Sequence, residues 1–193
     1  MVISFLCKIF FTGPYIVSGK HGNAIFTPNT GTFDDNVIDI GEHQTDCLGK
    51  ASNCPGGMTF SIWIKLDQQP HQYPTLLDSN NLVIHGYSVV DKFYITNDLR
   101  NETHKFEYKS VLSYNEWHLI AYTYTATAGF QLYMDGCKYP PRRISVFSVA
   151  IAPKSVTLGC RVERAYCSAV NFDDIRVWNE KKDEAFMWLL WRA

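Results

Sequence analysis

Short segments with the pattern of β-strands recur along almost the whole chain, and they constrain the fold more than any other feature. Each segment alternates apolar and polar residues with period two or is a short run of β-branched and aromatic residues. The segments are Asn23–Thr27, Asn36–Ile40, Met58–Lys65, Thr75–Leu77, Leu82–His85, Phe93–Thr96, Lys105–Lys109, Trp117–Thr125, Phe130–Met134, Ser155–Leu158 and Asn171–Trp178. This spacing predicts an all-β antiparallel sandwich.

Two of these segments indicate how the sandwich is layered. In Met58–Lys65 the side chains of Phe60, Ile62 and Ile64 share one face, which is entirely apolar. In Trp117–Thr125 both alternating sets of side chains are largely apolar. A strand that is apolar on both faces is typical of a central position, so we expect Trp117–Thr125 near the middle of its sheet.

The C-terminal third contains a predicted hairpin and one predicted helix. Asp135-Gly136 is a dipeptide typical of two-residue hairpin turns, so Phe130–Met134 should be followed by an antiparallel partner. A short helix is expected over Asp183–Trp191, because acidic residues open it and apolar residues recur at i,i+4 spacing. We expect this helix to pack on an edge of the sandwich.

Composition and charge limit the classes of protein to which the chain can belong. The 193 residues are 46% hydrophobic and 15% aromatic, with a formal net charge of −1, as in globular proteins. The balanced charge argues against nucleic acid as a partner, and no apolar run reaches the roughly 18 residues of a transmembrane segment. We expect one domain over residues 17–193, with residues 1–16 a weak signal segment or the edge of a longer protein.

The six cysteines bear on the cellular compartment. Cys47 and Cys54 flank a short loop of turn residues, and a disulfide is favoured over a zinc site because no second cysteine pair or clustered histidine accompanies them. A second bridge is expected between Cys137 and Cys160. Disulfides predict a protein that works outside the cell or at its surface, and the sequon at Asn101 adds a candidate N-glycosylation site.

The order of several sequence pieces resembles a known family. The chain carries, in order, VSGKHGNAIFTP, NVIDIG, CLGKASNCPGGMTFSIWIK, NEWHLIAYTY, FQLYMDG, SVTLG and FDDIRVWNEKKDEAFMWLL. This series resembles the laminin-G-like and pentraxin-like branch of the concanavalin A-like lectins and glucanases, from about Gly19 to Leu190. The resemblance implies a jelly roll of two stacked antiparallel sheets that serves as an extracellular adhesion or ligand-recognition module.

The resemblance also implies a calcium site on the rim of the sandwich. In the corresponding segment the candidate oxygen ligands are Asp78, Asn80, Asn81 and Asp91. The second ligand loop of pentraxins should fall within residues 159–171, where Glu163 is the acid before Asn171. Because so few carboxylates contribute, any calcium binding should be weak, in the range of extracellular modules.

Acidic residues and tryptophans could mark a site, but their positions favour structural roles. Asp173 and Asp174 stand at the start of a predicted strand, where carboxylates often fix a loop, and Arg176 is an available partner. Tryptophan side chains at strand positions are usually buried. We therefore expect core or inter-sheet packing, rather than a role as ligand platforms, for Trp63, Trp117 and Trp178.

Catalytic motifs are missing from the sequence. Retaining glycosidases of this architecture carry paired carboxylates as E-x-D-x-x-E or E-x-D-x-E, and no such string occurs. The sequence therefore favours a non-catalytic recognition module, within a larger secreted or cell-surface protein, that binds a glycan or an extracellular protein. Two alternatives stay open: a glycoside hydrolase of the same architecture and a purely structural spacer domain.

Overall fold

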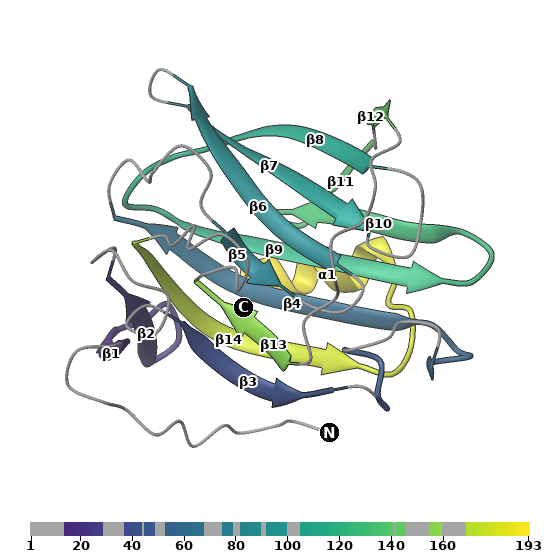
Figure 1. The fold of residues 1–193 in the computed structure, drawn as a ribbon, viewed down its shortest axis with the longest axis horizontal. Helices are drawn as coiled ribbons and strands as arrows, with labels where there is room; N and C mark the ends of the chain where they lie inside the picture. Colours follow the sequence, from purple (N-terminus) through teal and green to yellow (C-terminus); the bar gives the residue numbers. More distant parts are fainter. Residues whose placement is uncertain are drawn as a thin grey trace.

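The chain folds into two stacked antiparallel sheets, seen as two layers in the ribbon of Figure 1. The computed structural model describes residues 14–28, 37–43, 45–48, 53–67, 75–78, 82–89, 92–99, 105–140, 142–145, 155–159 and 169–193. The predicted antiparallel β-sandwich with one short C-terminal helix is confirmed.

Each sheet contains seven strands within the described part of the chain. The first sheet has the order β1 (Tyr15–Ser18), β2 (Asn23–Thr27), β14 (Val170–Trp178), β4 (Met58–Leu66), β9 (Trp117–Thr125), β10 (Gly129–Met134) and β11 (Cys137–Tyr139). The second sheet has the order β12 (Arg142–Ser145), β8 (Lys105–Leu112), β7 (Lys92–Leu99), β6 (Leu82–Val89), β5 (Thr75–Asp78), β13 (Ser155–Leu158) and β3 (Ile38–Glu42). As expected, β9 lies inside its sheet, between β4 and β10.

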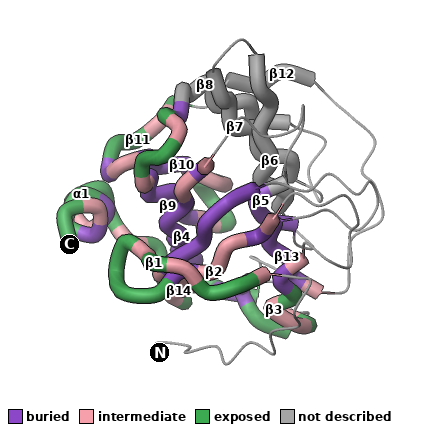
Figure 2. The backbone as a smooth tube through the Cα atoms, turned by 90° about the vertical axis from the view of Figure 1, so that its left-hand side faces the viewer, coloured by how far each residue is buried: buried purple, intermediate pink, exposed green. Residues whose placement is uncertain are grey.

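The main core lies between the two sheets. Strand β4 turns Phe60, Ile62 and Ile64 into it, as the alternation predicts. From the second sheet Leu77 and Leu158 meet them, each at most 1% exposed. In Figure 2 the buried segments of β4 and β9 lie inside the molecule, and the exposed segments follow its outer turns.

A second, smaller apolar layer covers the outer face of the first sheet. The helix α1 (Glu184–Arg192) packs there through Met187 and Leu190, which lie against residues of β4, β9 and β10. Figure 2 shows α1 on the side of this sheet that faces away from the second sheet. The helix therefore lies over a sheet face and reaches the edge strand β11, rather than sitting on an edge alone.

The sequence pattern overlooked three strands, namely β1, β11 and β12. Strand β1 begins at Tyr15, within the segment expected to be a leader. The turn predicted at Asp135-Gly136 is confirmed, and so is the antiparallel partner expected after it, because the turn joins β10 to β11 with positive φ angles of 49° and 75°. Strand β11 has only three residues, which are too few to show an alternating pattern.

Candidate ligand-binding face

All five tryptophans of the chain gather on the outer face of the first sheet. Alternation along β4, β9 and β14 turns three of them outward, and the i,i+3 spacing in α1 supplies two more. We call this outer face, together with α1, the tryptophan face. Its tryptophans are Trp63, Trp117, Trp178, Trp188 and Trp191.

The tryptophans differ in exposure. Trp63 is 2% exposed and belongs to the cluster beneath Leu190 of α1, so its interpretation as a packing residue is confirmed. Trp117 and Trp178 are partly exposed, and Trp188 is 41% exposed. Trp117 and Trp178 pack, partly buried, against the core cluster of Trp63, Leu119 and Leu190, as the packing interpretation expects, but this cluster lies beneath α1 and not between the sheets.

Cations lie over several of these rings. The ammonium nitrogen of Lys20 is 5.0 Å from the centroid of Trp63, and that of Lys65 is 5.7 Å from the centroid of Trp117. The guanidinium carbon of Arg192 lies 4.8 Å from the centroid of the Trp188 ring. The face thus combines aromatic rings with hydrogen-bond donors, a combination suited to a ligand that carries both apolar and polar groups.

One row of side chains crosses the end of the tryptophan face. Asn171 of β14 pairs with Lys65 of β4, which pairs with Trp117 of β9. Asp67, just after β4, closes the row, because its Oδ1 accepts a hydrogen bond of 2.6 Å from Asn171 Nδ2 and lies 3.4 Å from Lys65 Nζ. We call these four residues the terminal row.

The turn between β1 and β2 covers the neighbouring part of the face. The backbone N–H of His21 donates a 2.8 Å hydrogen bond to Asp173, whose side chain is buried, and the His21 ring lies against Trp63. Asp174 forms a two-point ion pair with Arg176, with contacts of 2.7 and 2.6 Å. The structural interpretation of Asp173 and Asp174 is confirmed.

Two tyrosines have perturbed pKa values for a physical reason. Tyr122 is buried in the core, stacked on Phe60, and burial raises the pKa of its phenol far above the ordinary value of 10.0. Burial also raises the pKa of Tyr133 beneath α1, against the lowering effect of a hydrogen bond with Thr123. Both phenols therefore remain neutral at physiological pH.

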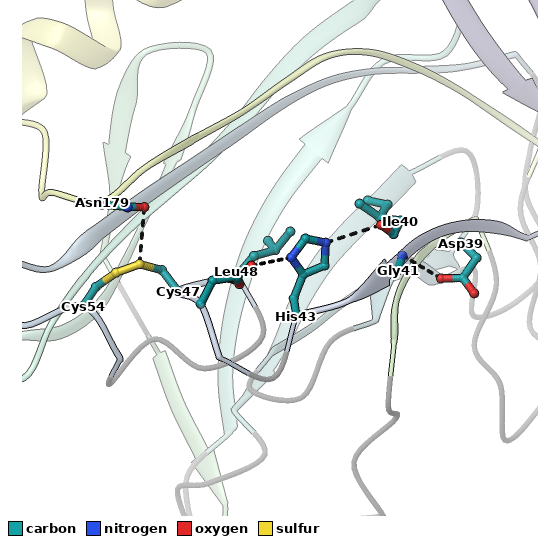
Figure 3. Close-up of polar contacts among 9 residues, drawn as sticks. Asp39, Ile40, Gly41, His43, Cys47, Leu48, Cys54 and Asn179 are labelled. Carbon is teal, nitrogen blue, oxygen red and sulfur yellow. Dashed lines mark hydrogen bonds and ion pairs between the residues drawn. A yellow bond between two sulfur atoms is a disulfide. The ribbon is translucent and has the colours of Figure 1, made fainter. Parts of the chain in front are cut away.

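The predicted disulfide between Cys47 and Cys54 is present, with the two Cα atoms 5.5 Å apart (Figure 3). Asn179, which follows β14, lies against Cys47 with 3.4 Å between Oδ1 and Sγ. In the same close-up His43 contacts the backbone oxygen of Ile40 at 3.3 Å. The contact between Cys47 and Asn179 holds the disulfide loop against the segment that leads into α1.

The other predicted bridge is wrong. Cys137 is a free, exposed thiol at the start of the edge strand β11. Its predicted partner, Cys160, lies outside the described residues.

Of the four candidate calcium ligands, only Asp78 lies within the described residues. Asp78 ends β5 with its side chain fully buried, next to Thr157 of β13 and Val83 of β6. Asn80, Asn81 and Asp91 lie outside the described residues, as does the sequon at Asn101. Within the described ranges no three His, Cys, Asp or Glu residues cluster as metal ligands.

Sequence reasoning missed part of the tryptophan face. At Trp188 and Trp191 the sequence pattern indicates only a short helix, and it does not distinguish the polar residues of the terminal row. A usable signal was present, because outward positions of β4 and β9 carry Trp63, Lys65 and Trp117 where a solvated face would carry small polar residues. The gathering itself depends on tertiary contacts between distant strands.

Residues 41–185 match the family described as the concanavalin A-like lectin/glucanases superfamily. No curated protein matches this sequence. Among solved structures, the botulinum neurotoxin serotype D/C binding domain is similar, with a TM-score of 0.63 and 12% identity over 93% of this chain. This chain spans 45% of the length of that toxin domain.

Two carbohydrate-active proteins contain similar folds. Domain 4 of AbnA, an extracellular arabinanase of Geobacillus stearothermophilus, was solved with arabinotriose; it matches with a TM-score of 0.61 and 14% identity, over 92% of this chain and 80% of that one. The sialidase of Trypanosoma rangeli matches with a TM-score of 0.53 and 14% identity, over 70% of this chain and 22% of that one. At such identities the likeness establishes the fold.

Proposed function

The chain belongs to the concanavalin A-like lectin/glucanases superfamily, and on that premise we propose that it is a non-catalytic recognition module that binds a glycan on the tryptophan face. The sheet face offers flat aromatic rings for the apolar side of a sugar and charged groups for its hydroxyls. The family and the fold support a lectin-like binding domain.

One observation carries the proposal: the five tryptophans share one outer face, and that face also holds exposed cations. Aromatic side chains usually serve the core, and here the core between the sheets is built without any tryptophan. A partly exposed aromatic face on a monomeric domain is typical of a binding surface.

Similar structures support a glycan over other ligands. One solved complex of a botulinum neurotoxin binding domain contains SialylT, and the arabinanase domain contains arabinotriose. Another toxin complex contains rat synaptotagmin II, so a protein ligand is the second outcome that a binding test must detect. Only the inward side chains of each strand must pack in the core of this fold. The outward side chains, and with them the ligand, can therefore differ between proteins that share it.

The alternative of a glycoside hydrolase lacks support from three other acids near the face. Asp173 and Asp174 hold the β1–β2 turn and Arg176, while Asp183 caps α1 by accepting a 2.8 Å hydrogen bond from the backbone of Phe186. A retaining glycosidase needs two carboxyl groups about 5–5.5 Å apart and directed at one sugar bond. These three carboxylates serve separate structural contacts.

We further propose that the protein works outside the cell or at its surface. The disulfide between Cys47 and Cys54 supports an oxidising compartment. No helix in the described part of the chain is long and apolar enough to cross a membrane. The calcium rim stays a prediction, and glycan binding on the tryptophan face does not depend on it.

A binding screen tests the proposed function. The purified full chain is applied to an array of immobilised glycans, neutral and anionic, and to a panel of cell-surface ectodomains. We expect saturable binding to one group of glycans and no hydrolysis of them. Binding to an ectodomain alone would replace the glycan by a protein ligand, hydrolysis would favour the glycosidase, and silence on every probe would favour a structural spacer.

A further inference from the structure

The terminal row points to a specific subsite. We propose that Trp117, Lys65, Asp67 and Asn171 form the binding site for one neutral pyranose ring, an inference that rests on the proposed glycan recognition and names its location and sugar class. Trp117 would receive the apolar C–H face of the sugar, and Lys65 with Asp67 would bind two of its hydroxyls.

The sheet holds this row in place before any ligand arrives. Asn171, Lys65 and Trp117 stand side by side on three hydrogen-bonded strands, β14, β4 and β9. Asn171 is buried and donates to both the backbone oxygen of Lys65 at 3.2 Å and the carboxylate of Asp67 at 2.6 Å. Preorganised groups lose little entropy on binding, so such a row suits a small ligand.

Asp67 has one oxygen engaged and one available. Oδ1 receives Asn171 Nδ2 and faces Lys65 Nζ, whereas Oδ2 has no hydrogen-bond partner within the part of the chain that the structure describes. The Asp67 side chain is 37% exposed, so the carboxylate lies within reach of a ligand. It can accept a hydrogen bond from a sugar hydroxyl.

Lys65 supplies the complementary donor. Its ammonium carries three N–H groups, and the Asp67 contact at 3.4 Å occupies one of them. The group also lies over the Trp117 ring, and its side chain is 27% exposed. Because the lysine side chain is flexible, its ammonium can move away from the Trp117 ring and bind a sugar hydroxyl. The sugar ring can then stack on the indole.

The charges select the class of sugar. The ammonium of Lys65 and the carboxylate of Asp67 balance each other, so the row carries no net charge. An anionic sugar gains no net attraction at this site, because repulsion by the Asp67 carboxylate offsets attraction by the Lys65 ammonium. A neutral pyranose has adjacent hydroxyls, of which one can donate a hydrogen bond to the carboxylate and another can accept one from the ammonium.

The experiment measures binding of small sugars to the full-length chain by NMR titration. The probes are the methyl pyranosides of glucose, galactose and mannose, with methyl glucuronide and galactose 6-sulfate as anionic comparisons. We expect at least one neutral pyranoside to bind with millimolar affinity and to shift the Trp117 indole signal, and the anionic probes to bind more weakly.

Substitution then locates the site. Asp67→Asn keeps the shape of the side chain and should weaken binding about tenfold, since hydrogen bonds to charged groups are the stronger ones. The matched control is Asp39→Asn in the second sheet, where the exposed carboxylate of Asp39 accepts a hydrogen bond from the backbone N–H of Gly41. The affinity of this control variant for the sugar should equal that of the wild type. Trp117→Phe, checked for folding by its thermal melt, should also weaken binding.

Two results would overturn the subsite. If no pyranoside binds, or if the anionic probes bind best, the proposed sugar class is wrong. If a sugar binds equally well to the wild type, Asp67→Asn and Trp117→Phe, the location is wrong. The function proposed above survives both results as long as the glycan array gives saturable binding, so the two failures can be told apart.

Discussion

The backbone N–H of His21 lies 2.8 Å from Oδ2 of Asp173, although 152 positions separate the two residues. This bond fastens the β1–β2 turn to β14 and places the His21 ring against Trp63. Lys20 of the same turn covers the Trp63 ring. The turn therefore forms one border of the tryptophan face.

Gly19 tests this border. A methyl group there would lie 2.5 Å from Asp173 Oδ2 and 2.9 Å from the backbone nitrogen of Ala24, so Gly19→Ala must displace the turn. We expect a loss of about 1–3 kcal/mol in the free energy of unfolding, measured in urea. Gly56→Ala is the control, because its nearest neighbour would be Asn179 at an ordinary 3.7 Å. Equal stability of both variants would contradict the close packing.

The disulfide should contribute measurably to stability. Replacing both Cys47 and Cys54 by Ala should lower the free energy of unfolding by about 2–3 kcal/mol, as the loop-entropy account gives for a short loop. Thermal and urea unfolding measure the loss. The control Cys137→Ala removes a free, exposed thiol and should change stability by less than about 0.5 kcal/mol. A double variant as stable as the wild type would show that the bridge is unimportant.

Tyr122 should make the fold sensitive to alkali. Its pKa is raised by burial, so in the unfolded chain the phenol loses its proton near pH 10 while in the folded chain it keeps it. Stability is thus fully present below about pH 10 and is lost as the pH rises above it. Urea unfolding between pH 8 and 11 measures this slope.

Tyr122→Phe provides the comparison for that slope. Phenylalanine keeps the ring stacked on Phe60 and removes the titrating group, so the decline above about pH 10 should be shallower. Part of the decline should remain, because burial also raises the pKa of Tyr133. An identical slope in the wild type and the variant would mean that Tyr122 ionises equally easily in the folded and unfolded chains.

Asp135 should matter for both its backbone and its side chain. It has a φ of 49°, and its carboxylate lies 2.8 Å from both the backbone nitrogen of Leu119 and His118 Nδ1. Asp135→Ala should cost about 2–3 kcal/mol, because it loses these contacts and places alanine in a left-handed conformation. Asp135→Asn tolerates that conformation and keeps an acceptor, so it should retain more of the stability in urea unfolding. Equal losses would exclude this explanation.

The sequence predicted the layers of the fold well, because the strands that build them have strong periodicity. Strands β2, β9 and β13 begin and end at the predicted residues, and α1 is displaced by one residue, with Asp183 as its cap. The weak points were short edge strands such as β11, whose three residues contain no readable period. An alternating sequence pattern can identify a single strand, whereas the position of a strand at a sheet edge depends on which other strands pair with it.

The candidate site was less predictable. Alternation places Trp63, Lys65 and Trp117 on outward positions, but a period cannot tell whether an outward face meets solvent or a helix. The hydrogen bond between Asn171 and Asp67 joins residues 104 positions apart, which no local pattern encodes. The wrong Cys137–Cys160 bridge has the same origin, because connectivity depends on which strands become neighbours.

The most direct test of glycan recognition on the tryptophan face is the indole N–H region of the NMR spectrum, where each of the five tryptophans gives one signal. The full chain is titrated with the glycan that binds best on the array, and the signals are assigned by single Trp→Phe variants. We predict saturable shifts for Trp117 and for neighbours on the same face, while Trp63, whose Nε1 is buried, stays unchanged. Saturable binding with all five signals unmoved would contradict the account.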